Sequence, residues 1–295
     1  MDTTVFLQLL LPGLTTGCVY ALVALGFVLC ANVSGVVNFA QGEFVMLGGM
    51  AAAWLIGLGV PFGVAILAAT VLGGLAGAAQ EFLTLAPVRR QPQFIQITTT
   101  VGFAVVLRGV TLIVAGKDAL SVPGFSGDGV FFVLGAILPV QSLWVWGATL
   151  LLLLGTFGFL RYTSTGRAVR ACSINLQAAR LMGVNAERLR VIVFAASGAT
   201  GALAGVVITP IVLASWDAGL SYSTKGFIGA IIGGFRSPST AVAAGLFIGL
   251  LESLGAGYVS SGWQEFIVYG VLLAWLLVQG GVFLRGRLDA TAGGP

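Results

Sequence analysis

Charge and histidine are what this sequence has least of. Only 8% of its 295 residues are charged, and it contains no histidine. The absence of histidine removes the commonest metal ligand and general base, together with every Ser–His or Cys–His catalytic arrangement. The three cysteines, Cys18, Cys30 and Cys172, form neither a CxxC pair nor an even set, which argues against disulfides. The sequence also lacks the G-x-x-x-x-G-K-[S/T] phosphate cradle, so we expect no ATP hydrolysis, cofactor or metal site in this chain.

Hydrophobic residues make up 58% of the chain, and the mean hydropathy is +1.03. The apolar runs are about 20 residues long, which is the length of a transmembrane helix. Because backbone in lipid must satisfy its own hydrogen bonds, the sequence predicts an all-α polytopic membrane protein, organised as one domain over residues 1–295. The net charge of +4 is small and dispersed, and we assign the arginines to loops that face anionic lipid rather than nucleic acid.

We expect about eight or nine transmembrane segments, with two short or broken helices among them. The predicted spans cover residues 5–31, 38–58, 61–85, 95–115, 140–160, 191–214, 241–258 and 263–284. A Gly-rich stretch, Ser221–Arg236, is too short for a standard span. Polar breaks interrupt the apolar pattern at Asn38–Glu43 and at Lys225–Ser237. Residues 116–139 form a longer external loop with room for a small hairpin or helix.

The positions of the arginines predict the orientation. Basic residues gather on the cytoplasmic side, and an external N-terminus places both Arg89–Arg90 and the loop Arg161–Arg190 inside. Arg285 and Arg287 also fall inside if Ser221–Arg236 crosses the membrane, which gives nine crossings. If that stretch re-enters from the outside instead, there are eight crossings and the C-terminus lies outside. The arginine bias favours nine.

The loop Arg161–Arg190 holds six of the fourteen basic residues. Within it, residues 175–182 fit a short helix, and Gly183 is a natural helix stop. One face of this helix is formed by Leu176, Ala179 and Met182. A short, partly apolar helix on the inner surface is what a membrane subunit needs if a soluble motor is to push on it. The alternative is a solvated loop that only fixes the topology.

Ionisable groups inside spans cost about 2.5–3.5 kcal/mol each on insertion scales, so each needs a partner or a function. The candidates are Glu43, Glu81, Arg108 and Glu252. Glu81 lies near the inner end of its span, where its carboxylate can reach the interface. Arg108 lies deep enough to need a carboxylate or a wet cavity, and Glu252 is similarly deep. A pair between the two is one option, which the sequence alone leaves open. For all four, we rank structural pairing or capping ahead of substrate contact.

The two breaks are the other candidate sites. The segment Asn38–Gln41 has the spacing of a capping box, with Asn38 at the N-cap and Gln41 at the third helical position. A broken helix exposes backbone N–H groups at membrane depth, and the positive end of its dipole attracts a carboxylate. The break Lys225–Ser237 offers the same chemistry. Two interrupted segments in separate halves of a chain point to a transport pathway.

Several segments resemble the permeases of branched-chain amino acid ABC importers of the LivH type, along nearly the whole chain. The matching segments are Gly17–Leu22, Val37–Glu43, Ile97–Gly102, Thr165–Ala171, Ala178–Asn185, Lys225–Phe227, Gly233–Gly234 and Gly249–Glu252. With the breaks and the resemblance together, the candidate residues for the substrate pathway are Asn38, Gln41, Glu43, Thr99 and Lys225.

The inner loop also resembles the E-A-A-x-x-x-G pattern by which ABC permeases dock into their ATPases. Gln177–Ala179 and Gly183 carry the match, and Gln177 replaces the Glu of the pattern. The candidate residues for ATPase coupling are Arg167, Arg170, Leu176, Gln177, Ala178, Ala179, Met182 and Gly183.

The resemblance implies a permease subunit of the bacterial inner membrane that moves branched-chain or related hydrophobic amino acids into the cytoplasm. It implies a second, LivM-like permease subunit, two cytosolic ATPase subunits that hold ATP and Mg²⁺, and a periplasmic solute-binding protein, with membrane lipid around the chain. A permease of the same family for urea or short amides is the alternative. An ion-coupled secondary carrier usually has more buried acids or a histidine relay, and a non-transporting scaffold leaves the two breaks unexplained.

Overall fold

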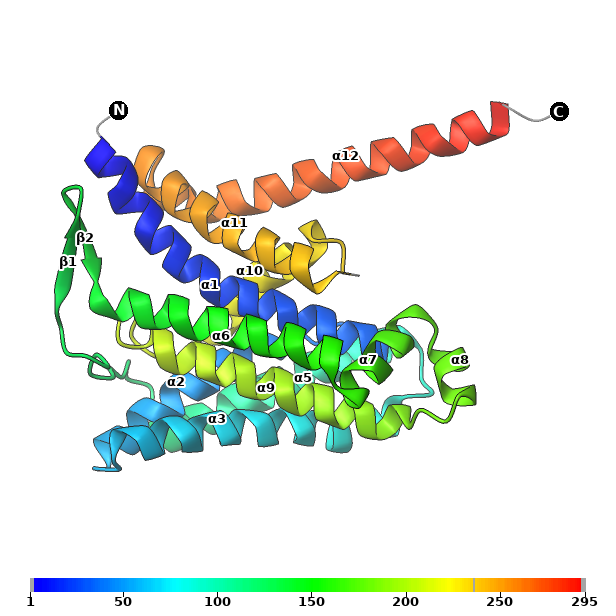
Figure 1. Ribbon diagram of the computed structural model, residues 1–295, viewed down its shortest axis with the longest axis horizontal. Coiled ribbons are helices and arrows are strands. Elements are labelled where there is room, and N and C mark those ends of the chain that lie inside the picture. The colour runs from blue at the N-terminus through cyan, green and yellow to red at the C-terminus, as the bar shows by residue number, and fades with distance from the viewer. Residues whose placement is uncertain (1–2, 236, 293–295) are drawn as a thin grey trace.

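The computed structural model describes residues 3–235 and 237–292, and it consists of long helices with one small hairpin (Figure 1). The long elements are α1 (Thr3–Ser34), α2 (Gln41–Gly57), α3 (Phe62–Ala79), α5 (Gln93–Ala115), α6 (Val140–Tyr162), α9 (Ala186–Ile208), α10 (Ala218–Ile232), α11 (Pro238–Tyr258) and α12 (Gln264–Ala292). The short elements are the π-helical turn η1 (Gln80–Leu85), α4 (Ala86–Val88), β1 (Val130–Val133), β2 (Ala136–Pro139), α7 (Ser164–Ile174), α8 (Leu176–Leu181) and the 3₁₀ turn η2 (Ser261–Trp263). The predicted all-α polytopic membrane protein is confirmed.

Helix length divides the membrane elements into two groups. Within the described residues, seven helical segments are long and apolar enough to cross a membrane. Two further helices, α2 and α10, have only 17 and 15 residues. At about 1.5 Å per residue, α10 reaches about 22 Å, which is less than the ~30 Å hydrocarbon core. The predicted combination of about eight or nine segments with short helices agrees with this. The side chains of Arg285 and Arg287, and all of Arg236, lie outside the described part.

Helix α1 forms the centre of the bundle. Its residues from Cys18 to Val28 are almost all fully buried, and α1 packs against α9, α10 and α11. Gly17 and Gly249 bring the backbones of α1 and α11 into close approach. Small residues allow such approach, and helices in lipid associate through it. By contrast, α6 and α12 expose apolar side chains such as Leu151 and Leu277, as lipid-facing helices do.

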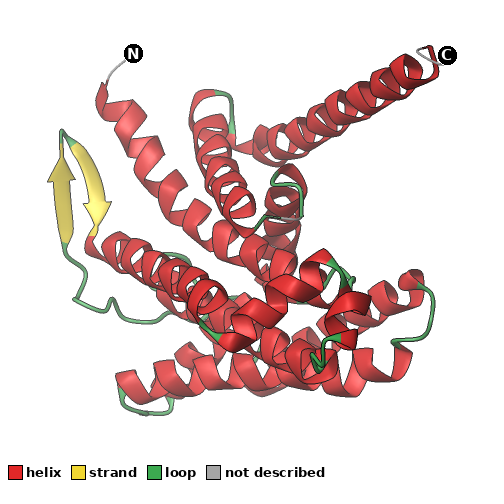
Figure 2. Ribbon diagram, turned by 45° about the vertical axis from the view of Figure 1, so that its right-hand side comes forward, coloured by secondary structure: helices red, strands yellow, loops and turns green. Residues whose placement is uncertain are grey.

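The two ends of the bundle differ in structure. The antiparallel hairpin β1–β2 lies at the end where α1 begins, and α7 and α8 lie at the opposite end (Figures 1 and 2). The hairpin turns at Leu134 and Gly135, whose φ values of 49° and 87° suit a type I′ turn. The hairpin expected as one option within residues 116–139 is therefore confirmed. The arginine-rich loop lies at the opposite end from this hairpin, as the predicted orientation requires.

A Gly205→Ala substitution should lower thermal stability. A Cβ atom at position 205 would meet the carbonyl of Val45 and the backbone of Gly49, where α9 crosses α2. Overpacking costs about 1–3 kcal/mol, so the melting temperature of the purified protein in detergent should fall. Gly102→Ala is the matched control, because position 102 in α5 has open space around it and Ala is the better helix former. Equal melting temperatures for the two variants would contradict the close packing of α2 on α9.

Candidate functional site

The chain between α1 and α2, residues 35–40, interrupts the helical pattern inside the bundle. Asn38 is fully buried there. Its Nδ2 donates to Gln80 Oε1 at 2.9 Å, and Gln80 Nε2 donates back to Asn38 Oδ1 at 2.6 Å. Gln80 begins the π-helical turn η1, in which Gln80 and the next residue, Glu81, are both buried. The amide pair therefore ties the first break to the end of α3.

Two hydroxyl groups from other helices complete the hydrogen bonding of the first break. Thr100 Oγ1 on α5 accepts from the N–H of Phe39 at 3.2 Å. Ser223 Oγ on α10 accepts from the N–H of Gly42 at 2.8 Å. The N–H groups that we expected to be open to a carboxylate are therefore occupied, and the prediction of an open helix N-terminus at this break is wrong.

The start of α2 also differs from the predicted capping box. Helix α2 begins at Gln41 with Ala40 at its N-cap, so Asn38 is not the capping residue. Asn38 Oδ1 accepts from the Ala40 N–H at 3.1 Å, and Gln41 Oε1 accepts from the hydroxyl of Ser197 on α9 at 2.8 Å. The capping box is wrong because both side chains have long-range partners that a short sequence window does not contain.

Thr99 does not face the break. Its hydroxyl donates to the carbonyl of Ile95 in its own helix at 2.8 Å, and the side chain is half-buried. Its neighbour Thr100 is fully buried and makes the contact with Phe39. Sequence reasoning missed Thr100 because a run of three threonines does not show which one faces inward.

The buried carboxylates have ion-pair partners other than those expected. Glu43 pairs with Arg108, and Glu81 pairs with Arg89 at 2.8 Å. Arg108 therefore does not pair with Glu252, which the sequence had left open as one partner. The expectation that Glu81 reaches the interface is wrong, because Glu81 is fully buried. Each carboxylate nevertheless keeps one oxygen, Oε2, for which the described part of the chain supplies no hydrogen-bond partner.

The second break begins later than predicted. Helix α10 continues through Lys225 to Ile232, and the break starts at Gly233. Gly234 and Phe235 both have positive φ, 84° and 54°. The N–H of Phe235 donates to a carbonyl within the last turn of α10 at 3.0 Å, which is the hydrogen bond of a Schellman motif.

Four phenylalanine rings connect the two breaks. They are Phe27 on α1, Phe39 in the first break, Phe227 on α10 and Phe235 in the second break. Phe227 lies at the centre, with ring centroids 5.1 Å from Phe39 and 5.9 Å from Phe235. The two irregular segments therefore share one packed aromatic cluster.

A cavity of about 420 Å³ lies beside Lys225. Lys225 pairs with Glu252 of α11, and Gln264 of α12 donates to the same carboxylate. The ring of Tyr20 lies with its centroid 5.6 Å from the Lys225 ammonium. Hydroxyls also line the cavity, from Thr16, Tyr20, Ser221, Tyr222 and Ser253. Apolar side chains complete the wall, among them Val19, Ile208 and Val212. One space therefore offers a cation, an anion, hydroxyls and an apolar wall.

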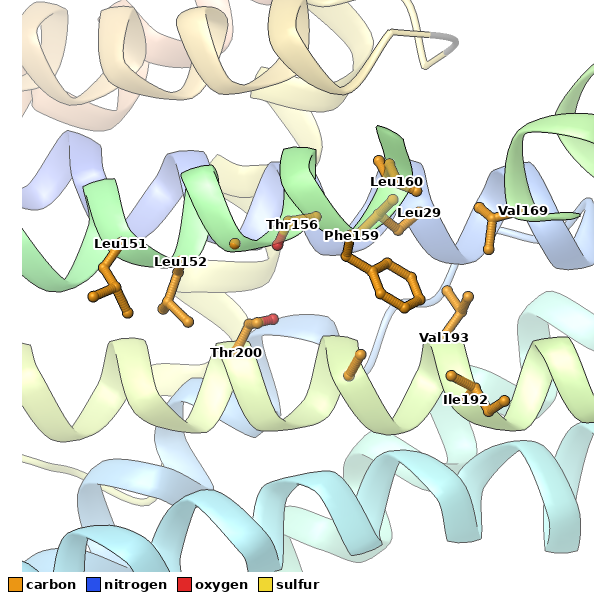
Figure 3. A pocket seen from close by; sticks show the side chains of 12 residues that line it. Leu29, Leu151, Leu152, Thr156, Phe159, Leu160, Val169, Ile192, Val193 and Thr200 are labelled. Carbon is orange, nitrogen blue, oxygen red and sulfur yellow. The ribbon is translucent and has the colours of Figure 1, made fainter. Parts of the chain in front are cut away.

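Two other cavities lie nearer to α7. The first, of about 310 Å³, lies between α6 and α9, and Figure 3 shows Thr156 and Thr200 among apolar side chains there. Its apolar lining suits an acyl chain or a helix better than a charged solute. The second, of about 860 Å³, is lined by Arg170 of α7 and by Ser237 and Pro238. It places α7 beside the second break.

The arginine-rich loop folds into α7 and α8, and each helix begins at a side-chain cap. Thr163 Oγ1 accepts from the Gly166 N–H at 2.9 Å, and Asn175 Oδ1 accepts from the Ala178 N–H at 3.0 Å. After α8 the chain turns at Gly183, which has a φ of 85°. The predicted short helix and its glycine stop are therefore confirmed.

Helix α8 turns a different face outward than expected. Ala179, which is only 4% exposed, packs with the half-buried Leu176 into a cluster that includes Cys172. The apolar side chains that face outward are Ile174, Leu181 and Met182, with exposures of 87%, 89% and 85%. Four other candidates, Arg167, Arg170, Gln177 and Ala178, are also exposed. Burial raises the pKa of the Cys172 thiol above its ordinary value, which keeps it protonated and unreactive at neutral pH.

Comparisons with known proteins agree with this architecture. The family model described as "Branched-chain amino acid transport system / permease component" matches residues 9–276. The chain is 30% identical over 298 residues to the high-affinity branched-chain amino acid transport system permease protein LivH of Escherichia coli (strain K12), with 93% of this chain and 94% of that protein covered. The LivH protein of Salmonella typhimurium is also 30% identical, with the same coverage.

Among solved structures, PsaBC from Streptococcus pneumoniae in complex with Fab has a TM-score of 0.52 at 14% identity, with 92% of this chain and 90% of that chain covered. At that identity the likeness concerns the fold alone. The family model and the LivH relatives also show the family, because the model matches residues 9–276 and the relatives are 30% identical over 93% of this chain. This chain belongs to the family of branched-chain amino acid ABC transport permeases.

Proposed function

We propose that this chain is the membrane permease subunit of an ABC importer that carries branched-chain or related hydrophobic amino acids across the bacterial inner membrane into the cytoplasm. The observation that carries the proposal is the buried Lys225–Glu252 pair on the wall of the 420 Å³ cavity. Membership of the permease family supports the transport activity, and the names of the LivH relatives support the substrate class.

The charge pair suits an amino acid because an amino acid carries both charges itself. Its carboxylate would bind Lys225, and its ammonium would bind Glu252, whose Oε2 has no hydrogen-bond partner within the described chain. The Tyr20 ring adds a cation–π contact for the ammonium. After this exchange of partners, every buried charge still has an opposite charge beside it. An unpaired buried charge would be costly. The aliphatic side chain would pack against Val19 and Ile208.

A solute without charges gives the pair no such exchange. Urea and short amides carry no charge, so they cannot replace either partner of the Lys225–Glu252 ion pair. The pair would have to stay joined while such a solute binds. The relatives reported above are named for branched-chain amino acids, and they give the urea alternative no support. An amino acid is therefore the better match for the cavity.

Energy for transport would enter at the opposite end of the helix bundle, at α7 and α8. The outward-facing Ile174, Leu181 and Met182 form an apolar tip on α7 and α8, and a groove on a cytosolic ATPase subunit would accept such a tip. In this scheme ATP and Mg²⁺ are held by two ATPase subunits. A second permease subunit and a periplasmic solute-binding protein complete the assembly.

Neutralising both members of the pair tests the substrate site. A Lys225→Gln/Glu252→Gln double variant leaves no unpaired buried charge, so we expect it to fold and insert. Leucine uptake into reconstituted vesicles should fall about 10- to 100-fold, because hydrogen bonds to charged groups contribute about 1.5–3 kcal/mol each.

The Glu43–Arg108 pair supplies the comparison, since it is another ion pair with a fully buried carboxylate. A Glu43→Gln/Arg108→Gln variant is measured in the same vesicles, after both variants are shown to be monodisperse. If this variant loses uptake while Lys225→Gln/Glu252→Gln transports normally, the solute passes the first break and the proposed site is wrong.

A Leu181→Glu substitution tests the coupling tip. Leu181 is 89% exposed, so the fold should tolerate the change. A charge at an apolar anchor of an interface costs about 2 kcal/mol or more, and amino-acid-stimulated ATP hydrolysis in the reconstituted complex should fall at least about tenfold. Ser164→Glu is the matched control, because it adds the same charge to the exposed first turn of α7. Equal coupling in the two variants would mean that the loop only sets topology. Ala179→Glu would not test the coupling tip, because Ala179 is buried and a charge there would disturb the packing of α8 itself.

A further inference from the structure

A polar cavity of about 460 Å³ opens between α4 and the start of α9. It is lined by Arg89, Arg90, Arg180, Val184, Asn185, Ala186, Glu187 and Arg190. The four arginines come from three separate elements: the end of α4, helix α8 and the first turns of α9. The cavity lies at the arginine-rich end of the bundle, which the positive-inside rule assigns to the cytoplasm.

The carboxylates of the cavity neutralise only part of this charge. Arg89 is shared between Glu81 at 2.8 Å and Glu187 at 3.1 Å. In the described part of the chain, Arg90 and Arg180 have no ion-pair partner. Helix α9 also begins at this cavity, and the positive end of its dipole adds to the potential. The cavity therefore attracts an anion.

Arg190 is one of two arginines at the cavity whose side chain has an N–H donor without an acceptor among the residues that the structure describes. Its residue is 7% exposed, and its Nη2 donates to the Ser34 carbonyl at 3.3 Å. Its Nε, also buried, has no hydrogen-bond acceptor among the described residues, and the same holds for Nε of Arg89. Two buried guanidinium N–H donors without acceptors are costly. Carboxylate and phosphate groups are the acceptors that guanidinium groups bind by paired N–H bonds.

The surroundings of the cavity favour a lipid as the source of that phosphate. The helical stretch α3–η1–α4 that carries Arg89 and Arg90 exposes Phe82 and Leu83 about two turns earlier, at 69% and 64%. These side chains have the exposure of lipid-facing residues, so acyl chains lie close to the guanidinium groups. Basic cavities between helices at the cytoplasmic interface suit anionic headgroups.

We propose that this cavity binds the phosphate of an anionic phospholipid from the inner leaflet. The headgroup links α8, through Arg180, to the turn after α4 and to α9. It so holds α8 against the helical stretch α3–η1–α4, whose Gln80 pairs with Asn38 of the first break. The proposal concerns lipid and does not depend on which solute the permease carries.

The test uses the purified full chain in a neutral detergent, titrated with phosphatidylglycerol and separately with phosphatidylcholine, with bound lipid counted by native mass spectrometry. The variant is Arg90→Gln/Arg180→Gln, because both side chains are exposed at the cavity mouth. Arg161→Gln/Arg188→Gln is the matched control, which removes the same charge from the same membrane end but outside this cavity. At about fivefold in affinity per basic residue, phosphatidylglycerol should bind the variant about 25-fold more weakly than wild type.

The expected result is that phosphatidylglycerol binds tightly, phosphatidylcholine does not, and only the cavity variant loses affinity. Equal losses in the cavity variant and the control would overturn the site and leave a diffuse charge effect. Displacement of the lipid by an equal concentration of inorganic phosphate would overturn the lipid as the source. Unchanged phosphatidylglycerol binding in the Arg90→Gln/Arg180→Gln variant would show that the cavity does not hold the lipid, and the proposal would fail.

Discussion

The rest of the structure depends on one constraint: a backbone interrupted at membrane depth must find its hydrogen-bond partners within the protein. The helical pattern is interrupted after α1, where Val36, Asn38 and Ala40 are buried. Asn38 reaches Gln80, while Thr100 and Ser223 bond to the backbone of residues 39 and 42. These partners come from α3–η1, α5 and α10, so the break fixes the positions of three helices around α1. A polar segment that would be costly alone thus becomes the point that sets the arrangement of the bundle.

Buried carboxylates are also subject to this constraint, but the protein satisfies it for them only in part. Glu43, Glu81 and Glu252 each have a cationic partner, and each keeps one oxygen to which no group in the described part donates a hydrogen bond. Glu252 differs because the carboxylate itself and its partner Lys225 both line the same cavity, together with apolar side chains. A buried ion pair contributes little to stability relative to an apolar contact of the same size. Its presence beside a cavity is therefore better explained by a ligand than by folding.

The sequence predicted what local patterns control and failed where partners come from elsewhere in the chain. Apolar runs gave the helices, and Gly183 marked the end of α8 because a single residue with positive φ suffices. The capping box at Asn38 failed because Gln80 and Ser197 lie far away in sequence. The prediction of the outward face of α8 failed for a related reason. When a helix has apolar residues on two sides, its sequence does not reveal which side the rest of the protein covers. The ion-pair partners could not be assigned from the sequence either, since the depth of a residue in the membrane does not distinguish one oppositely charged partner from another.

The two ends of the molecule are joined by continuous packing rather than by a hinge. Ala179 of α8 packs in a cluster with Cys30 of α1 and Phe194 of α9. From that cluster α1 runs to Tyr20, which lies against Lys225. Between these points, the phenylalanine cluster packs both breaks against α1 and α10. Dense interiors transmit displacement and resist gradual deformation, so a shift of α8 would move the breaks and the charged cavity together.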